Sequence, residues 1–259
     1  MRGNTRHERN IYGSAWGVVH GGYFSDEKAA RPLVRELCAA ARALRPAVVA
    51  DLGGGTGFIL GLLARRRAFS GARLLDVDCS GKQLKACADS RVCHLNRPIQ
   101  RVSRREICRS GEGPLLLAMR SVLHYFGGEK SQQALLKRLR TLAKPGEYFV
   151  HQTACYAAAR DAALMNDIYR LMHTDKRYAT TAQVSRMLRL AGWAVEKIVP
   201  VDQIKLHSDD LVSRYRLAEK DLRVISAHVA RSKAYSAVAL NPTAFAGFLE
   251  YSVFVCRAV

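Results

Sequence analysis

The chain has 259 residues, of which 49% are hydrophobic and 24% charged, a composition typical of a folded globular protein. This length fits one large domain, with or without an inserted or appended cap. No run of eighteen apolar residues occurs, and residues 1–10 are polar and charged. The sequence therefore predicts neither a membrane span nor a secretory signal, and we expect a cytoplasmic protein.

The charge balance is strongly basic. Lys and Arg number 41 against 22 Asp and Glu, which gives a formal net charge of +19. Such a surplus attracts polyanions, so nucleic acid is one candidate partner class. The basic residues are scattered, however, with only short clusters at 65–67 and 101–109. This pattern favours a diffuse basic surface over a nucleic-acid-binding module.

The cysteine pattern predicts free thiols. The chain has seven cysteines, an odd number, and no pair has the C-x-x-C spacing of a zinc or redox site. We therefore expect no disulfide framework and no metal site.

In the first 153 residues, helical and strand patterns alternate. A helix is expected over 25–45, with Ser25 as a candidate N-cap and Pro32 marking either its true start or a kink. Further helices are expected over 58–66, 80–88 and 134–142, and strands over 47–52, 73–78, 92–95, 115–119 and 147–153. Residues 96–113 carry no clear pattern.

The second half is more helical. Helical patterns cover 154–173 and 208–236, and a helix capped by Thr180 or Thr181 runs to Leu190, where Gly192 stops it. Strands are expected over 193–201 and 249–256. The alternation predicts a Rossmann-like, doubly wound α/β fold with a mostly parallel sheet of about seven strands, helices on both faces and a helical cap.

This organisation divides the chain into four parts. Residues 1–24 would form an N-terminal lid and residues 25–153 a cofactor-binding core. Residues 154–192 would be a helical insertion or cap, and 193–259 would complete the sheet around a helical insertion at 208–236.

The clearest motif is Asp51-Leu52-Gly53-Gly54-Gly55-Thr56-Gly57, directly after the first strand. Alternating glycines let the backbone turn sharply and approach a ligand closely. Dinucleotide-binding enzymes also use glycine-rich loops, but with G-x-G-x-x-G spacing and no preceding acid. The D-x-G-x-G-x-G pattern resembles the first motif of class I S-adenosylmethionine-dependent methyltransferases. The resemblance implies that this loop lies under the methionine part of the cofactor and that Asp51 organises it or binds the ammonium group.

Other segments resemble the same family in the same order. Leu75 to Ser80 is similar to its G-x-D-x-S segment, which implies that Asp78 binds the ribose, with Cys79 beside it and Asp76 as the second choice. After the third strand the family's usual acid is absent from residues 96–99. The adenine contacts would then come from Ile99 and a backbone amide, or the true match lies a few residues away.

The exit of the fourth strand, Met119 to Phe126, resembles the x-x-L-H-x-F exit of small-molecule methyltransferases. This likeness places Arg120 and Ser121 beside the cofactor and His124 near the reacting methyl group. Similar turns and helices follow at 142–147 and 182–193, so the resemblance covers about residues 47–200. Upstream, residues 16–24 are similar to a segment that covers the cofactor in several such enzymes, although they would equally suit a hydrophobic staple.

The resemblance implies transfer of a methyl group from S-adenosylmethionine to an O, N or C nucleophile of a small-molecule metabolite, by in-line displacement in a closed pocket. The expected catalytic residues are His124, His20 and Tyr23, with His151 as a further candidate base. Aromatic residues of the cap would suit a flat acceptor or simply form the cap core. They include Tyr156, Met165, Tyr169, Met172, Arg214 and Tyr215.

Two alternatives remain open at this point. The basic charge would suit an RNA, DNA or protein methyltransferase, although residues 120–123 lack the [DNS]-P-P-[YF] motif of enzymes that methylate base amino groups. A non-catalytic S-adenosylmethionine-binding protein would also carry the glycine loop. The acceptor atom and the oligomeric state are left open by the sequence.

Overall fold

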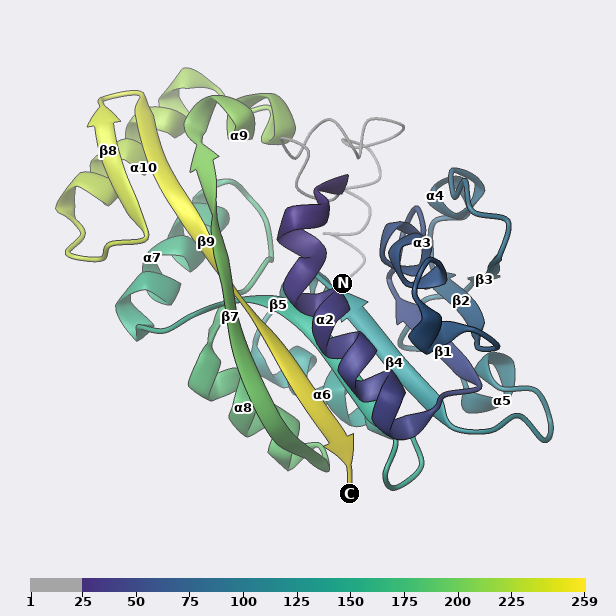
Figure 1. Ribbon diagram of the computed structural model, residues 1–259. Coiled ribbons are helices and arrows are strands. Elements are labelled where there is room, and N and C mark those ends of the chain that lie inside the picture. The colour runs from purple at the N-terminus through teal and green to yellow at the C-terminus, as the bar shows by residue number, and fades with distance from the viewer. Residues whose placement is uncertain (1–24) are drawn as a thin grey trace.

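The computed structural model describes residues 25–259, and within them the chain builds one sheet of nine strands (Figure 1). Seven of these strands follow the order β3-β2-β1-β4-β5-β9-β7, with β6 beside β5 and β8 beside β9. The strands are β1 (Val48–Leu52), β2 (Arg73–Asp78), β3 (Val92–Asn96), β4 (Leu115–Arg120), β5 (Tyr148–Tyr156), β6 (Ala179–Thr180), β7 (Trp193–His207), β8 (Ala237–Asn241) and β9 (Ala244–Ala258). From β3 to β5 all neighbours are parallel, whereas β9 runs antiparallel to β5, β7 and β8. The predicted Rossmann-like architecture is confirmed.

Helices cover both faces of the sheet. They are α2 (Glu27–Leu44), α3 (Phe58–Ala64), α4 (Gly81–Lys85), α5 (Arg104–Ile107), α6 (Glu129–Arg140), α7 (Ala159–Leu171), α8 (Thr181–Leu190), α9 (Ser208–Tyr215) and α10 (Glu219–Arg231). Because strand side chains alternate, Val48, Ala50 and Leu52 pack in one cluster with α6 and α8. Val49 faces the opposite side and packs in a second cluster with α2 and α3.

The start of α2 differs from the expectation. Asp26, not Ser25, is its N-cap, and its carboxylate accepts a hydrogen bond of 2.8 Å from the Lys28 backbone N–H. A carboxylate at this position also interacts favourably with the positive end of the helix dipole. Pro32 lies inside the helix, so the interpretation that it marks the true start was wrong.

A second unit lies at one end of the sheet. We call it the cap, and it consists of α7, α9, α10, β8 and the adjoining ends of β7 and β9. The long strands β7 and β9 run without a break from the core sheet into it, where β8 adds to the edge of β9 (Figure 1). Around this ribbon lie α7, α9 and α10, with a buried apolar cluster of their own. The helical pattern expected over 208–236 is divided between α9 and α10, because Arg216 adopts a left-handed φ of 53°.

Helix α8 lies outside this cap, although it falls within the 154–192 insertion expected from the sequence. Its residues Val184, Met187 and Leu188 are fully buried in the core cluster beside the sheet. The segment 96–113, which carried no clear pattern, contains the short α5, which Ser103 and Glu106 cap reciprocally. All seven cysteines, which lie between residues 38 and 256, are free thiols, as predicted.

Within the described residues, no helix has the length and apolar character that crossing a bilayer requires.

Candidate active site

The strand order places a ligand-binding edge between β1 and β4. The chain leaves β1 toward β2 and β3 on one side and returns to β4 on the other. In open α/β sheets, ligands bind at the carboxyl ends of the strands at this switch point. The glycine loop after β1 and the exit of β4 meet there: a Cβ on Gly53 would lie 2.7 Å from Cγ2 of Val122.

The glycine loop requires glycine at its alternating positions. Gly53, Gly55 and Gly57 have φ of 79°, 67° and 72°, in the left-handed region that other residues rarely adopt. Gly54 is needed for a different reason, because a Cβ there would lie 2.6 Å from Oδ1 of Asp76 and 2.8 Å from Oδ2 of Asp51. The loop backbone therefore rests directly on two carboxyl groups.

These two acids lie side by side beneath the loop. Asp51 on β1 is in register with Asp76 on β2, and the two side chains are 1% and 0% exposed. Burial raises the pKa of Asp51 to about 7, while the nearby Arg120 charge opposes this shift. Burial also raises the pKa of Asp76 to about 9, with the charges of Asp51 and Asp78 adding to the shift and the Gly57 and Gly54 amides opposing it. The pair therefore holds a proton near neutral pH.

Asp78 stands at the carboxyl end of β2, as the sequence predicted. Its Oδ1 accepts a hydrogen bond of 2.7 Å from the Ser80 backbone N–H, and its backbone carbonyl accepts one of 2.9 Å from the Asn96 side chain. The carboxylate is half-buried and fixed at the sheet edge, which suits a ligand hydroxyl. Cys79, next to it, is also half-buried. Ile99, 6% exposed, packs into the core cluster beyond β3.

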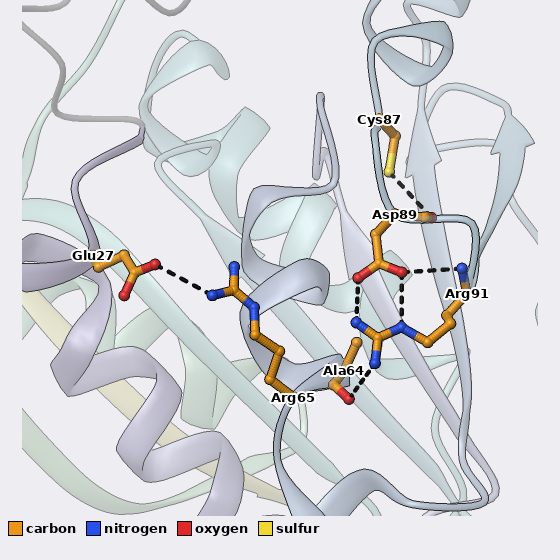
Figure 2. Close-up of polar contacts among 6 residues, drawn as sticks. All are labelled: Glu27, Ala64, Arg65, Cys87, Asp89 and Arg91. Carbon is orange, nitrogen blue, oxygen red and sulfur yellow. Dashed lines mark hydrogen bonds and ion pairs between the residues drawn. The ribbon is translucent and has the colours of Figure 1, made fainter.

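Polar contacts join the segment after α4 to the end of α3 (Figure 2). A Cβ on Gly57 would lie 2.5 Å from Sγ of Cys87, so the end of the glycine loop packs closely against the segment after α4. Arg91 makes paired hydrogen bonds of 2.8 and 2.7 Å to the Asp89 carboxylate and donates a third, of 3.0 Å, to the Ala64 carbonyl. Because Ala64 ends α3, these contacts tie the segment to the helix that follows the glycine loop.

The exit of β4 forms the other wall. Arg120 is 8% exposed and its guanidinium carbon lies 5.8 Å from the centre of the Phe58 ring. Ser121 has a left-handed φ of 58°, and its backbone N–H donates to the Gln152 carbonyl at 2.9 Å. Its hydroxyl donates to the Tyr251 hydroxyl at 3.4 Å, which joins the exit of β4 to the strand that enters the cap.

His124 lines a pocket between the core and the cap. The cavity has a volume of about 400 Å³, and its lining includes Tyr169, Tyr178, Lys176, Arg214 and Tyr251. The His124 ring stacks on Tyr178 with centroids 5.3 Å apart and lies 4.4 Å from the Tyr125 ring. A larger groove of about 850 Å³ lies on the other side of Lys176, along α6 and α7. The smaller pocket is lined by His124 and by Tyr251, whose hydroxyl bonds to Ser121 at the exit of β4, so it is the better candidate for an acceptor site.

Other expected site residues fall elsewhere. His20 and Tyr23, with the whole expected lid of residues 1–24, lie outside the described part of the chain. His151 is fully buried in the core, stacked between Phe149 and Phe254, and burial lowers its pKa to about 3. It is therefore neutral and distant from solvent, which is unsuitable for a general base.

The cap residues named from the sequence divide into two groups. Tyr169 lines the pocket, whereas Met165 and Met172 are packed in the interior of the cap. Sequence reasoning missed Lys176, Tyr178 and Tyr251, whose side chains line the pocket. Within residues 25–259, no group of three His, Cys, Asp or Glu side chains is arranged to hold a metal ion.

Comparison with known proteins identifies the fold. No family model matches the chain, and no curated protein matches it by sequence. Among solved structures, a provisionally assigned methyltransferase of Bacillus halodurans superimposes with a TM-score of 0.67 at 14% identity, covering 86% of this chain and 97% of that one. The 1,6-didemethyltoxoflavin-N1-methyltransferase of Burkholderia thailandensis, solved with S-adenosylhomocysteine, has a TM-score of 0.54 at 18% identity over 100% of this chain and 90% of its own.

A third similar structure is the [4+2]-cyclase SpnF, with a TM-score of 0.52 at 15% identity over 87% of this chain and 80% of that one. At these identities the likeness is one of fold. The chain has the fold of the class I S-adenosylmethionine-dependent methyltransferases, as its motifs predicted.

Proposed function

We propose that this chain binds S-adenosylmethionine and transfers its methyl group to a small-molecule acceptor. The observation that carries the proposal is the glycine loop, which lies at the switch point of the sheet with its backbone resting on the buried Asp51 and Asp76. Side-chain-free backbone at this edge leaves room for a ligand, and Asp51, which ionises near neutral pH, favours a cation there. S-adenosylmethionine carries positive charge on both its sulfur and its amino group.

Different residues around this edge would bind different parts of the cofactor. The loop from Gly53 to Gly57 would lie under the methionine part, with Asp51 offsetting its positive charge. Asp78 would accept hydrogen bonds from the ribose hydroxyls, and Cys79 and Ile99 would lie toward the adenine. Arg120 and Ser121, at the exit of β4, would border the sulfur end. The bound cofactor supplies a methyl group on a cationic sulfur, which a nucleophile displaces.

The chain's own contribution to the reaction is alignment and proton removal. An in-line displacement requires the acceptor to be held close to and in line with the methyl carbon, and the pocket beside His124 would hold it there. If the acceptor is a hydroxyl, His124 would take its proton, because this imidazole lines the same pocket. A pocket of about 400 Å³ has the size of a small-molecule site, which supports a small metabolite over a nucleic acid.

The proposal is tested by calorimetric titration with S-adenosylhomocysteine. Wild-type protein should bind it, and Asp78→Asn should weaken binding about ten- to a hundredfold, because it removes a charged hydrogen-bond acceptor. Glu219→Gln is the matched control, since it removes one carboxylate charge from the exposed surface of α10 and should leave the affinity unchanged.

Turnover requires a separate measurement, because the fold also serves a cyclase. Protein incubated with methyl-labelled S-adenosylmethionine and pools of metabolites should transfer label to a small molecule. Absence of S-adenosylhomocysteine binding by folded wild-type protein would overturn the cofactor assignment. Binding without transfer to any pool would instead favour a non-methylating use of the same site.

A further inference from the structure

Strand β8 lies at an edge of the sheet and differs from two other edge strands. Strand β3 lies between Arg91 and Arg97, and β7 contains Lys197 and Lys205 among other charged residues. The segment Ala237–Asn241, which forms β8, contains neither a charged residue nor a proline. Charged residues and prolines are common means by which a sheet edge avoids pairing with another chain. The β8 edge is therefore open to such pairing.

Two apolar side chains of β8 face solvent. Val238 is 58% exposed and Leu240 is 60% exposed. Ala237 and Ala239 alternate with them along the strand and pack against the apolar cluster of the cap. Val238 and Leu240 therefore lie together on the outer face of the cap ribbon, on its outermost strand (Figure 1).

One side of the β8 backbone pairs with no other strand of residues 25–259, because β8 is bonded to β9 alone. The Phe248 N–H donates to the Ser236 carbonyl at 2.9 Å. Residues of an antiparallel strand alternate between bonding to one side and to the other, so Val238 also bonds toward β9. The N–H and C=O groups of Ala237 and Ala239 consequently point away from β9, toward the open side.

The charge of the chain indicates which partner suits this edge. Between Lys233 and Glu250 the sequence has no charged residue, although the formal net charge of the chain is +19. Two copies of so basic a chain repel each other, and a contact between them is opposed least where both surfaces are uncharged. An acidic partner would instead be attracted to the basic surface elsewhere. The uncharged edge therefore favours a second copy of this chain.

The sequence of β8 is also complementary to itself. When two copies are placed antiparallel about a two-fold axis at Ala239, Val238 of each copy lies opposite Leu240 of the partner subunit. Opposite residues of antiparallel strands point to the same face, so these four apolar side chains would form one cluster. The two Ala239 residues would exchange hydrogen bonds through their outward N–H and C=O groups. Such an interface uses the same surface patch of both copies, as most homodimers do.

We propose that the chain forms a two-fold dimer in which β8 pairs antiparallel with β8 of a second copy and extends the sheet across the join. The dimer is independent of the proposed methyl transfer, since no residue of β8 lines the pocket beside His124. Each copy has one such edge, and pairing occupies it, so assembly stops at two. The contact is small, and we expect a dissociation constant on the order of 1 to 100 µM.

Analytical ultracentrifugation of nuclease-treated protein over a concentration series tests the proposal. The mass should rise from 28.7 kDa at high dilution toward twice that value and no further. Added salt should favour the dimer, because it screens the repulsion between basic copies. Bridging by a residual polyanion would weaken with salt instead. Amide hydrogens of residues 234–241 should exchange more slowly at concentrations that favour the dimer.

Double variants test the pairing at Ala239. Val238→Lys with Leu240→Lys places like charges opposite each other and should weaken the dimer about tenfold or more. Val238→Glu with Leu240→Glu should do the same, although it lowers the net charge. Val238→Lys with Leu240→Glu places opposite charges face to face and should recover part of the lost affinity. Leu190→Lys, at an exposed apolar position on α8 outside the cap, is the control and should dimerise like wild type.

A mass of 28.7 kDa at every concentration, assembly beyond two copies, or wild-type dimerisation by all three double variants would overturn the proposal. Equal affinities of the lysine pair, the glutamate pair and the mixed pair would overturn the pairing at Ala239. Both side chains are exposed, so the variants should fold, and circular dichroism checks this. If a variant does not fold, the concentration series and the amide exchange of wild-type protein decide.

Discussion

Asp76 makes the stability of the folded chain depend on pH. Its pKa is raised from 3.8 to about 9, so the folded state holds a proton that the unfolded chain has released over this range. The contribution of Asp76 to the free energy of unfolding should therefore be complete below about pH 4 and decrease as the pH rises toward 9, by up to about 1.4 kcal/mol per pH unit for one proton. Asp76→Asn should flatten this dependence, as measured by urea unfolding at pH 5, 7 and 9. An unchanged slope would show that Asp76 ionises normally.

His124 offers a second prediction for a single residue. If it removes the acceptor proton, His124→Asn should lower turnover about a hundredfold or more, the usual contribution of a general base. Affinity for S-adenosylhomocysteine should stay the same, because His124 lines the proposed acceptor pocket and lies outside the glycine loop. His94→Asn, on the exposed edge of β3, is the matched control. Full activity of the His124 variant would mean that the acceptor needs no base or uses another one.

The positions of Asp51, the glycine loop and Asp78 in the fold could be predicted from sequence because these residues are close together along the chain. Asp51 and the glycines belong to one strand-to-loop segment, and Asp78 ends the next strand, so periodicity alone aligns them. Lys176 could not be predicted in this way. Its neighbours Asp175 and Arg177 are exposed, and the segment has the composition of a solvated turn. Its burial depends on Tyr125 and Tyr215, which are distant in sequence.

Among the elements, α8 has the clearest boundaries. Thr180 is its N-cap: the Thr180 side chain accepts from the Gln183 backbone N–H at 3.1 Å, and the Gln183 side chain accepts from the Thr180 N–H at 2.8 Å. Thr180→Ala should lower the free energy of unfolding by about 1 kcal/mol. Thr181→Ala, one residue inside the helix, should cost less, and chemical denaturation of both variants measures the difference. Equal losses would show that the cap contributes little here.

The strands entering the cap are longer than the sequence indicated. Strand β7 was expected to end at 201 but continues to His207, and β9 begins at Ala244 rather than near 249. Register shifts between Val195 and Lys197 and between Val201 and Ile204 interrupt the alternation by which a strand is recognised. Strand β8 was missed because its short apolar run follows directly on a helical pattern. These features depend on pairing between distant segments, which local periodicity does not contain.

At the scale of the whole molecule, the core and the cap should unfold together. Each has its own apolar cluster, yet β7 and β9 belong to both, so neither unit can lose these strands without exposing the other. Circular dichroism at 222 nm and near-ultraviolet tyrosine signals, most of which arise in the cap, should give coincident denaturation curves. S-adenosylhomocysteine at about 100 times its dissociation constant should raise the stability of both by about 2.7 kcal/mol. Separate transitions would show two independent units.

Val201 pairs with Tyr251, so residues 202–250 form one insertion whose two ends lie next to each other in the sheet. The segment leaves the sheet on one strand and returns on its direct neighbour, so its two ends lie as close together as the ends of a hairpin turn. Insertions are tolerated best where the chain departs from and rejoins a fold at adjacent points. Lineages sharing this core could therefore exchange half of the residues that line the pocket beside His124 by lengthening or shortening one hairpin, while the edge at β1 and β4 stays unchanged.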